Sequence, residues 1–323
     1  MKEIKTQIET QIQNNQQSLR PLTFEDYIGQ SRIVENVKTS ISAAKLKKKP
    51  LGHILFYGPP GLGKTTMAGI IANEMGVNLR TVSAPNIEKQ GEMAAILSSL
   101  QEGDILFIDE IHRLPKFVEE ILYSAMEDYR IDVLIGEGQQ TKTVMLPLPV
   151  FTLIGATTKA GMVSAPLRDR FEAIYNLEYY SVDDLAKIAL RTSKTEQTKL
   201  DMEAAEVIAE AGRGTPRIVN NLTRRVCDYL LANNKNGKKK EIMAALSAIG
   251  IDSKGLSLSD RRYLDCLKNA SGKPVGLKTI SSYLGETTDT IAEDIEPYLI
   301  RKGFVQILPR GRFLTEKYLE AAI

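Results

Sequence analysis

One glycine-rich octet constrains the fold of this chain more than any other stretch. Gly58–Thr65 has the sequence Gly-Pro-Pro-Gly-Leu-Gly-Lys-Thr, follows the apolar run His53–Tyr57 and leads into the helix-forming segment Thr66–Ala72. A strand, a loop of the form G-x-x-x-x-G-K-[ST] and a helix make a phosphate-binding unit, because the glycines let backbone N–H groups turn inward and the helix adds its positive dipole end. A purely structural glycine turn is the alternative, but the flanking strand and helix favour nucleotide binding.

The loop assigns chemistry to individual side chains. Lys64 is expected to reach the β- and γ-phosphates of ATP, and the Thr65 hydroxyl is expected to hold Mg²⁺. Gly61, Gly63 and Thr66 complete the expected nucleotide contacts of the loop. These roles require the loop to lie at the carboxyl edge of a parallel sheet, where ligands bind in open α/β folds.

A second apolar strand, Ile105–Ile108, ends in the two carboxylates Asp109 and Glu110. If its end lies beside the loop, Asp109 can complete the Mg²⁺ shell and Glu110 can orient and deprotonate the attacking water. An ordinary strand that ends in solvated acids is the alternative. The upstream loop favours the catalytic interpretation, in which water attacks ATP and no side-chain nucleophile is needed.

The alternation of short apolar strands with helical patterns predicts an α/β domain with a parallel sheet covered on both faces. The expected strands are His53–Tyr57, Leu79–Ser83, Ile105–Ile108 and Phe151–Ala156. Beyond about Ser181 the pattern becomes helical throughout, which predicts a small all-helical domain. Its expected helices are Val182–Thr192, Met202–Ala211, Pro216–Ala232 and Lys239–Ile249.

The C-terminal segment predicts three helices followed by a hairpin, which is the winged-helix pattern. The helices are expected at Asp260–Asn269, Leu277–Leu284 and Thr288–Ile300, and the hairpin strands at Val305–Leu308 and Arg312–Leu314. We therefore expect a flexible segment over 1–17, a large domain over 18–180, a helical domain over 181–254 and a winged helix over 255–323, with a hinge at Ser253–Gly255.

The 323-residue length and a hydrophobic content of 43% suit a globular protein of several domains. The polar N-terminus lacks a signal-peptide core, and no apolar stretch reaches membrane-spanning length, which predicts a cytoplasmic protein without membrane contact. Two separated cysteines and two histidines favour buried thiols over a zinc site. The net charge of +2 does not by itself indicate a nucleic-acid partner.

Three further polar positions have a functional and an ordinary interpretation. Thr157 follows the strand Phe151–Ala156 and could sense the γ-phosphate, or it could cap a loop. Arg170 could stabilise transition-state charge in a neighbouring subunit, or form a surface pair with Asp169. Arg217, in the first turn of a helix, could couple the phosphate state to a domain angle, or be solvated.

Several motifs occur along the chain in an order that resembles the AAA+ ATPases and, within them, the bacterial RuvB family of Holliday-junction branch-migration motors. The motifs are Leu19–Pro21, Phe24–Gln30, Gly58–Thr65, Ile108–Arg113, Ile154–Gly161, Leu167–Phe171 and Gly214–Arg217. The resemblance covers Leu19 to Leu314 and favours the catalytic roles of Arg170 and Arg217.

The resemblance implies further positions. Leu19, Arg20 and Tyr180 would line the adenine side of the pocket, and Glu127, Asp128 and Tyr129 would lie near the nucleotide. The segment Arg130–Leu148 would form the hairpin that docks a RuvA-type junction-binding partner, through Ile131, Val133, Leu134 and Ile135. The residues themselves also allow an ordinary hairpin buried against the domain.

DNA contacts are expected at the wing. Arg310 and Arg312 flank Gly311 and suit phosphates at a groove edge, although a solvated turn is the alternative. The family often carries further arginines here, where this chain has Thr288 and Ile307. Thr288 can still donate to phosphate without charge, and Arg301 or Lys302 could compensate.

Together these features predict an ATP- and Mg²⁺-dependent motor that assembles into a homo-hexameric ring on the double-stranded arms of a four-way junction. One rival is a clamp-loader-like or chaperone-like AAA+ protein that remodels proteins, which the C-terminal winged helix opposes. A second rival is a non-hydrolysing, ATP-gated DNA-binding regulator, which Glu110 opposes.

Overall fold

The computed structural model describes residues 20–135, 142–252, 254–270 and 272–321. They divide into two compact units. The first holds the described residues up to Asp184 together with Thr215–Arg217, and the second holds Leu185–Gly214 and the described residues from Ile218 onward. None of the helices in these ranges is long and apolar enough to cross a membrane.

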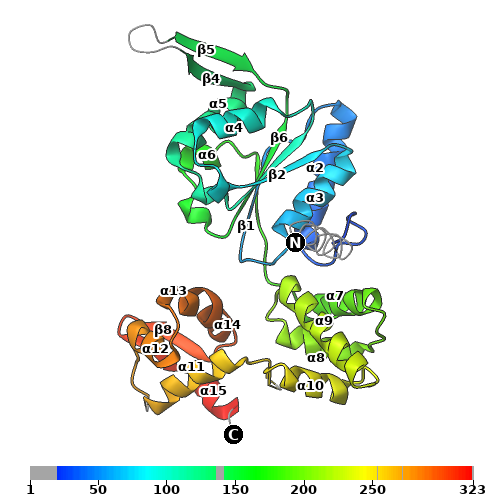
Figure 1. Cartoon of the computed structure of the whole chain (residues 1–323), viewed down its shortest axis with the longest axis vertical. Coiled ribbons are helices and arrows are strands. Elements are labelled where there is room, and N and C mark those ends of the chain that lie inside the picture. Colours follow the sequence, from blue (N-terminus) through cyan, green and yellow to red (C-terminus); the bar gives the residue numbers. More distant parts are fainter. Residues whose placement is uncertain (1–19, 136–141, 253, 271, 322–323) are drawn as a thin grey trace, which may run out of the picture. The chain divides into compact units, whose positions relative to one another are not determined.

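A five-stranded parallel sheet forms the centre of the first unit, as the alternating pattern predicts (Figure 1). The strands are β1 (Ile54–Tyr57), β2 (Leu79–Ser83), β3 (Ile105–Asp109), β6 (Thr152–Thr157) and β7 (Ala173–Asn176), in the order β2-β3-β6-β1-β7. The central strand β6 is buried along its whole length, which explains its nearly continuous apolar sequence. The edge strand β7 alternates between partly buried and exposed residues and has no strong apolar signal, so the sequence does not predict it.

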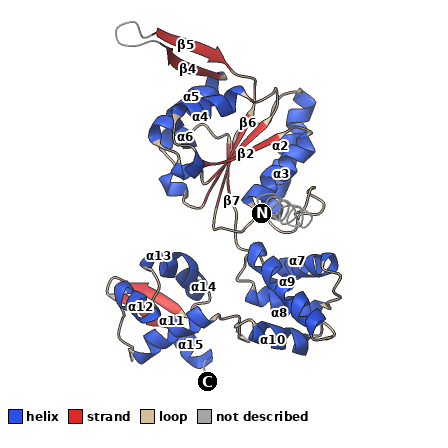
Figure 2. Cartoon of the chain, viewed as in Figure 1, coloured by secondary structure: helices blue, strands red, loops and turns tan. Residues whose placement is uncertain are grey.

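Helices cover both faces of this sheet (Figures 1 and 2). On one side lie α2 (Ser31–Lys47) and α3 (Lys64–Met75), and on the other lie α4 (Gln90–Ser98), α5 (Lys116–Asp128) and α6 (Ala165–Arg168). Short 3₁₀ turns occur at Ala84–Asn86, Ile111–Arg113 and Ala160–Met162. The sheet and the helices α4 and α5 enclose one apolar core, in which Leu55, Leu106 and Val118 are completely buried.

An antiparallel hairpin of β4 (Arg130–Ile135) and β5 (Lys142–Pro147) extends from the end of α5. Its register pairs Arg130 with Pro147 and Ile135 with Lys142. Tyr129, with φ of 51°, turns the chain from α5 into the hairpin. The predicted hairpin is therefore present, and its tip, 136–141, lies outside the described residues.

The second unit begins with a helical bundle. Its helices are α7 (Val182–Thr195), α8 (Met202–Ala211), α9 (Pro216–Ala232) and α10 (Lys239–Ala248), close to the predicted bounds. The first residues of α7 and α9 group with the first unit. Both cysteines are free thiols, and Cys227 is buried in this bundle.

The winged helix follows as α11 (Leu258–Asn269), α12 (Leu277–Leu284), α13 (Thr288–Thr290), α14 (Glu296–Arg301), β8 (Val305–Leu308), β9 (Gly311–Leu314) and α15 (Glu316–Ala321). A π-helical turn, Ile291–Ile295, joins α13 to α14 where Pro297 enters the helix. Proline has no backbone N–H and its ring collides with the carbonyl one turn earlier, so a widened turn accommodates it. The sequence does not predict this turn or α15.

Candidate active site

The glycine loop adopts backbone conformations that require glycine. Gly61 and Gly63 have φ of 78° and 103°. A Cβ on Gly61 would lie 2.9 Å from the Cβ of Arg217, and one on Gly63 would lie 2.9 Å from the hydroxyl of Tyr27. The loop therefore folds tightly against Arg217 and Tyr27, leaving its N–H groups for a ligand.

Lys64 opens α3 and turns its ammonium group back into the loop. Its Nζ donates hydrogen bonds to the carbonyl oxygens of Gly58 and Pro59, at 2.8 and 3.0 Å. Burial lowers the pKa of Lys64, while the nearby charges of Glu110 and Asp109 oppose that shift. Thr65 and Thr66 follow in the first turn of the same helix and are half-buried. The loop thus gathers a cation and two hydroxyl groups where β1 ends.

Asp109 and Glu110 lie at the carboxyl end of β3, as predicted. Burial raises the pKa of Asp109, while Lys64 and Arg217 act in the opposite direction. The Oδ1 of Asp109 accepts a hydrogen bond from the Glu110 N–H at 3.0 Å. The cluster therefore joins Lys64, Asp109, Glu110 and Arg217, which are far apart in the sequence.

Glu110 is restrained through both its backbone and its side chain. Its φ of 49° places it in the left-handed region, which carries a conformational cost for a residue with a Cβ. Its Oε2 accepts hydrogen bonds from the N–H and the hydroxyl of Thr158, both at 3.1 Å, and lies 3.2 Å from Nδ1 of His112. Burial lowers the pKa of His112, which favours its neutral form.

Thr158 therefore contacts Glu110, while the γ-phosphate-sensing role of Thr157 stays a prediction. Thr157 is completely buried, and its Oγ1 lies 2.9 Å from Nδ1 of His112 and accepts a hydrogen bond from the N–H of Lys159. Thr157 is also tied to the loop, since its carbonyl oxygen accepts a hydrogen bond from the Gly58 N–H at 3.2 Å. Sequence reasoning missed His112, for which the available signal is its place two residues after Glu110.

The predicted adenine-side residues are only partly placed at the loop. Tyr180 is 9% exposed, and its hydroxyl donates to the carbonyl of Leu62 at 3.2 Å and lies 2.9 Å from the hydroxyl of Tyr27. Tyr27 therefore supports the pocket as well, and sequence reasoning did not assign it that role. Arg20 is exposed, and Leu19 lies outside the described residues. The backbone N–H of Arg217 donates to the Gly61 carbonyl at 3.4 Å.

Arg170 and Glu127 lie at the opposite edge of the sheet from the loop of their own chain. Tyr129 packs against the rings of His53 and Phe151, the residues that precede β1 and β6. Arg170 comes shortly before β7, and its Nη2 bonds Oε2 of Glu127 at 2.9 Å.

The Arg170 guanidinium also donates to the carbonyls of Tyr123 and Pro166. Asp128, beside Glu127, pairs with Arg130 at 3.1 Å. Since the loop follows β1 and these groups precede the strands, they face away from their own ATP loop.

The two arginines of the wing have different environments. Arg310 is exposed in the turn between β8 and β9. The Nε and Nη2 of Arg312 donate to the carboxylate of Glu296 at 2.8 and 3.2 Å, and Glu296 is only 3% exposed. This placement argues against a freely available charge on Arg312 and leaves Arg310 as the accessible cation of the turn. Thr288 is half-buried at the start of α13.

Of the four apolar residues predicted for partner contact, the structure describes the side chain of Ile131. Ile131 is only 1% exposed, so its expected role in partner contact is corrected: it joins the domain core and anchors the hairpin. The side chains of Val133, Leu134 and Ile135 lie outside the described residues. On β5, Val144, Met145 and Leu146 are exposed, Met145 by 63%.

The described residues contain no cluster of three His, Cys, Asp or Glu side chains that could hold a metal ion. A hydroxyl and a carboxylate at the loop, Thr65 and Asp109, are nevertheless hard oxygen donors of the kind that Mg²⁺ accepts together with phosphate and water. Asp109 also retains Oδ2, which makes no hydrogen bond with a described residue.

Three family models cover most of the chain. They are the Holliday junction DNA helicase RuvB P-loop domain at residues 19–177, the RuvB AAA lid domain at 180–252 and the RuvB C-terminal winged helix domain at 253–322. Among curated relatives, the Holliday junction branch migration complex subunit RuvB of Lactobacillus gasseri is 53% identical over 306 residues, covering 94% of this chain and 90% of its own. The subunit of the same name from Campylobacter hominis is 49% identical over 304 residues, covering 94% and 89%.

A solved structure described as the Thermotoga maritima RuvB Holliday junction branch migration motor matches with a TM-score of 0.82. It is 42% identical in sequence, and the match covers 94% of this chain and 98% of that one. The likeness thus spans the P-loop domain, the lid and the winged helix.

Proposed function

This chain belongs to the RuvB family, and from that premise we propose that it is the ATP-hydrolysing motor that drives branch migration of Holliday junctions in recombination and repair. The observation that carries the proposal is the cluster of Lys64, Asp109, Glu110 and Arg217 in a chain that also ends in a winged helix. The cluster suits hydrolysis of ATP, and the winged helix suits contact with a DNA duplex.

The loop would bind the polyphosphate. The Lys64 ammonium would exchange its bonds to the Gly58 and Pro59 carbonyls for phosphate oxygens, which restores full charge pairing to a buried cation. Thr65 and Asp109 would hold Mg²⁺, which neutralises developing phosphate charge when bound. Leu19, Arg20 and Tyr180 remain the proposed adenine-side contacts.

Glu110 would orient the attacking water and accept its proton. In the described contacts its carboxylate is engaged by Thr158 and His112. We therefore interpret this arrangement as a resting state, from which Glu110 must be released toward the γ-phosphate before each turnover. Thr158, with the buried Thr157 behind it, would thus relate the state of the phosphate to the position of Glu110.

The active site would be completed by a second subunit. Arg170 and Glu127 lie at the edge of the sheet away from their own loop, so a head-to-tail ring would present them to the nucleotide of a neighbour. An arginine supplied in this way stabilises the charge of the transition state. Asp128 and Tyr129 would lie at the same interface. We propose a homo-hexamer on this basis and on the family's precedent.

The winged helices would grip the double-stranded arms without reading their sequence. Arg310 is the proposed phosphate contact at the wing, Thr288 an uncharged one, and Arg312 a support for the turn through Glu296. Arg301 and Lys302 both lie close to the Tyr298 ring. Neither is therefore a simple substitute for the arginines that the family often carries at the positions of Thr288 and Ile307.

The hairpin β4–β5 would dock a junction-binding partner of the RuvA type. On β5, Val144, Met145 and Leu146 are exposed apolar side chains, with Val144 and Leu146 on one face of the strand and Met145 on the other. Val133, Leu134 and Ile135 stay proposed contacts from the sequence. A cytoplasmic location accords with the free buried thiols of Cys227 and Cys266.

Stimulation of ATP hydrolysis by DNA separates this function from its rivals. A DNA motor should hydrolyse ATP faster when linear duplex is added, whereas a protein-remodelling AAA+ ATPase should not respond. A non-hydrolysing regulator should bind ATP without releasing phosphate in a single-turnover assay. An ATPase rate that is indifferent to duplex and junction DNA, with and without the partner, would contradict the proposal.

A further inference from the structure

One short turn contributes residues to both compact units. Thr215–Arg217 group with the first unit, and a Cβ on Gly61 would lie within 2.9 Å of both Thr215 and Arg217 side-chain atoms. Arg213, four residues before Arg217, belongs to the second unit. Arg213 has φ of 55°, a conformation that a residue with a Cβ adopts at a cost and that here aims the chain from α8 into this turn. Residues 213–217 therefore form a short covalent link between the glycine loop, beside which Thr215 and Arg217 lie, and the contacts of Arg213.

Arg213 contacts the winged helix at three points. Its Nη2 bonds the Oδ2 of Asp260 in α11, its guanidinium lies 4.7 Å above the Tyr298 ring, and its carbonyl accepts a hydrogen bond from Arg301. The planar guanidinium pairs with a carboxylate and stacks on an aromatic face at the same time, which a lysine at this position could not do.

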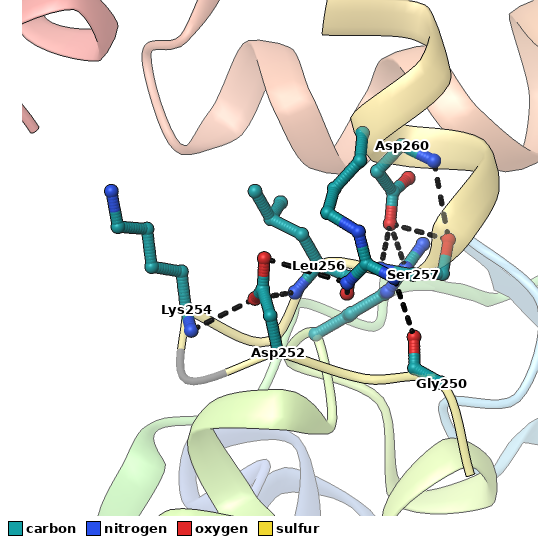
Figure 3. Close-up of polar contacts among 8 residues, drawn as sticks. Gly250, Asp252, Lys254, Leu256, Ser257 and Asp260 are labelled. Atoms are coloured by element: carbon teal, nitrogen blue, oxygen red, sulfur yellow. Dashed lines mark hydrogen bonds and ion pairs between the residues drawn. The ribbon is translucent and has the colours of Figure 1, made fainter. Parts of the chain in front are cut away.

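Asp260 is an unusual partner because it is completely buried. Its Oδ2 also accepts hydrogen bonds from the N–H and the hydroxyl of Ser257, both at 2.7 Å, and so caps α11 (Figure 3). Its Oδ1 has no hydrogen-bond partner among the described residues. A buried carboxylate with one oxygen lacking a hydrogen bond destabilises the fold unless a cation pairs with it. The ion pair with Arg213 therefore stabilises the buried charge of Asp260.

The linker between the lid and the winged helix is tied to α11 rather than left as the expected hinge. Arg261 donates to the carbonyls of Leu256 and Gly250, at 2.9 and 3.3 Å, and lies 3.5 Å from the carboxylate of Asp252. The Oδ1 of Asp252 accepts from the N–H groups of Lys254 and Leu256, both at 2.9 Å (Figure 3). Two separate sets of bonds therefore join the lid to the winged helix.

We propose that Arg213 is a positioning residue that locks the winged helix to the lid, so that a lid movement set by Arg217 at the nucleotide reaches the DNA. The inference rests on the proposed motor function. Arg213 touches neither nucleotide nor DNA; it makes the lid and the winged helix move as one body. Loss of these Arg213 contacts should leave ATP hydrolysis intact but reduce the junction movement obtained for each ATP hydrolysed.

The test compares full-length variants for ATP turnover and for junction movement. Arg213→Met keeps the aliphatic stem on Tyr298 and removes the ion pair. The double variant Arg213→Met/Asp260→Asn removes the buried charge as well, so it should fold even if the single variant does not. The matched control is Arg224→Gln, which breaks an ion pair with Glu196 of 3.4 Å inside the lid.

We expect both Arg213 variants to keep the ATP affinity and the DNA-free ATPase rate of the natural chain. The amount of four-way junction dissociated per ATP hydrolysed should fall about fivefold or more, the size of a typical coupling between sites. Arg224→Gln should retain both properties. A residue that only stabilises the fold would be rescued by the double variant, which would then couple normally.

Normal junction movement per ATP in the folded double variant would overturn the inference while leaving the motor function standing. By contrast, a natural chain that never dissociates junctions with ATP would refute the proposed function itself. The two failures are therefore distinguished by the natural chain measured in the same assay.

Discussion

Glu110 shows how much of the proposed mechanism depends on a single side chain. Its backbone conformation is left-handed, and its carboxylate is engaged by Thr158 and His112. These restraints hold the carboxylate in the resting arrangement, near enough to Lys64 and Asp109 for its charge to influence the pKa of each. Glu110, the proposed general base, makes none of the hydrogen bonds that tie Lys64 to the glycine loop, so its replacement should leave the loop intact.

Replacement Glu110→Gln should therefore abolish turnover but not ATP binding. Loss of a general base typically costs about 10²–10⁴-fold in rate, whereas the phosphate contacts of Lys64 remain. Phosphate release and nucleotide binding, measured on the same preparation, test this expectation. The exposed Glu25→Gln in the same unit is the control and should behave as the natural chain does. Near-normal turnover in Glu110→Gln would assign the base to another group.

His53 makes the first unit sensitive to acid. Its Nδ1 accepts a hydrogen bond from the Leu153 N–H at 2.8 Å, so the proton resides on Nε2, which lies 3.1 Å from the Met126 carbonyl. Burial lowers the pKa of His53 below its ordinary value of 6.5. The unfolded chain therefore takes up the proton first, and stability that is present above pH 6.5 is lost as the pH falls toward the lower folded pKa.

The midpoint of thermal unfolding should accordingly drop between pH 7.5 and pH 5, by up to about 1.4 kcal/mol of stability for each pH unit below the ordinary value. In His53→Gln the drop should be shallower, since His112 is then the sole remaining histidine of the chain. Parallel pH profiles for the two proteins would exclude His53 as the cause.

Short motifs lead the sequence analysis to Lys64, Asp109, Glu110 and Arg217, and the structure brings these four together, while their roles in catalysis stay a prediction. The sequence does not predict the contact of Thr158 with Glu110, because that contact depends on how the chain turns after the end of β6 at Thr157. It also misassigns Ile131, whose burial depends on how the hairpin leaves α5.

Among the elements, the wing separates two arginines that the sequence treats as equivalent. Both flank Gly311, but a bridge between Val275 and Arg312 places β9 beside the body of the domain, where Glu296 is buried. Arg312 thus contributes to stability, and Arg310 is available to a phosphate.

Replacement Arg310→Ala should weaken duplex binding and lower the slope of log affinity against log salt by about 1, without changing the unfolding midpoint. Replacement Arg312→Ala should instead leave Glu296 uncompensated and destabilise the winged helix by about 3 kcal/mol. Salt titrations of duplex binding and thermal unfolding of both variants test the contrast, each variant serving as the other's control. An unchanged salt slope in Arg310→Ala would remove it from the phosphate contacts.

The helices of the lid and the strands β1, β3 and β6 follow from the sequence pattern because the strands are largely buried and the helices each bury one face. Other elements do not, among them β7 and the π-helical turn. β7 is a short edge strand whose pairing is decided by β1, and the π-helical turn before α14 arises from Pro297 within an otherwise regular helix. Both depend on neighbours that a local pattern does not contain.

For the whole molecule, the proposed function requires an active site shared between subunits. Arg170 and Glu127 lie at the end of the sheet where its strands begin, whereas their own loop lies where β1 ends. No single sequence motif predicts this arrangement. The residues alone leave a trans role and a surface pair open for Arg170, and the resemblance favours the trans role. The structure adds a geometric reason for that proposal.

Mixing two inactive variants tests the shared site. Arg170→Ala should bind ATP but lose turnover by about 10³-fold or more, and Lys64→Ala should fail to bind ATP. Mixed rings should regain part of the activity, because a Lys64→Ala subunit can offer Arg170 to the intact loop of its neighbour. An inactive mixture of assembled rings would contradict the shared site.

The most direct test of the central claim is dissociation of a synthetic four-way junction into duplexes, with and without a RuvA-type partner. We predict that duplex products accumulate with ATP and the partner, and fail to form with a non-hydrolysable ATP analogue or with Lys64→Ala. Brisk ATP hydrolysis that leaves the junction intact under every one of these conditions would contradict the assignment of this chain as a branch-migration motor.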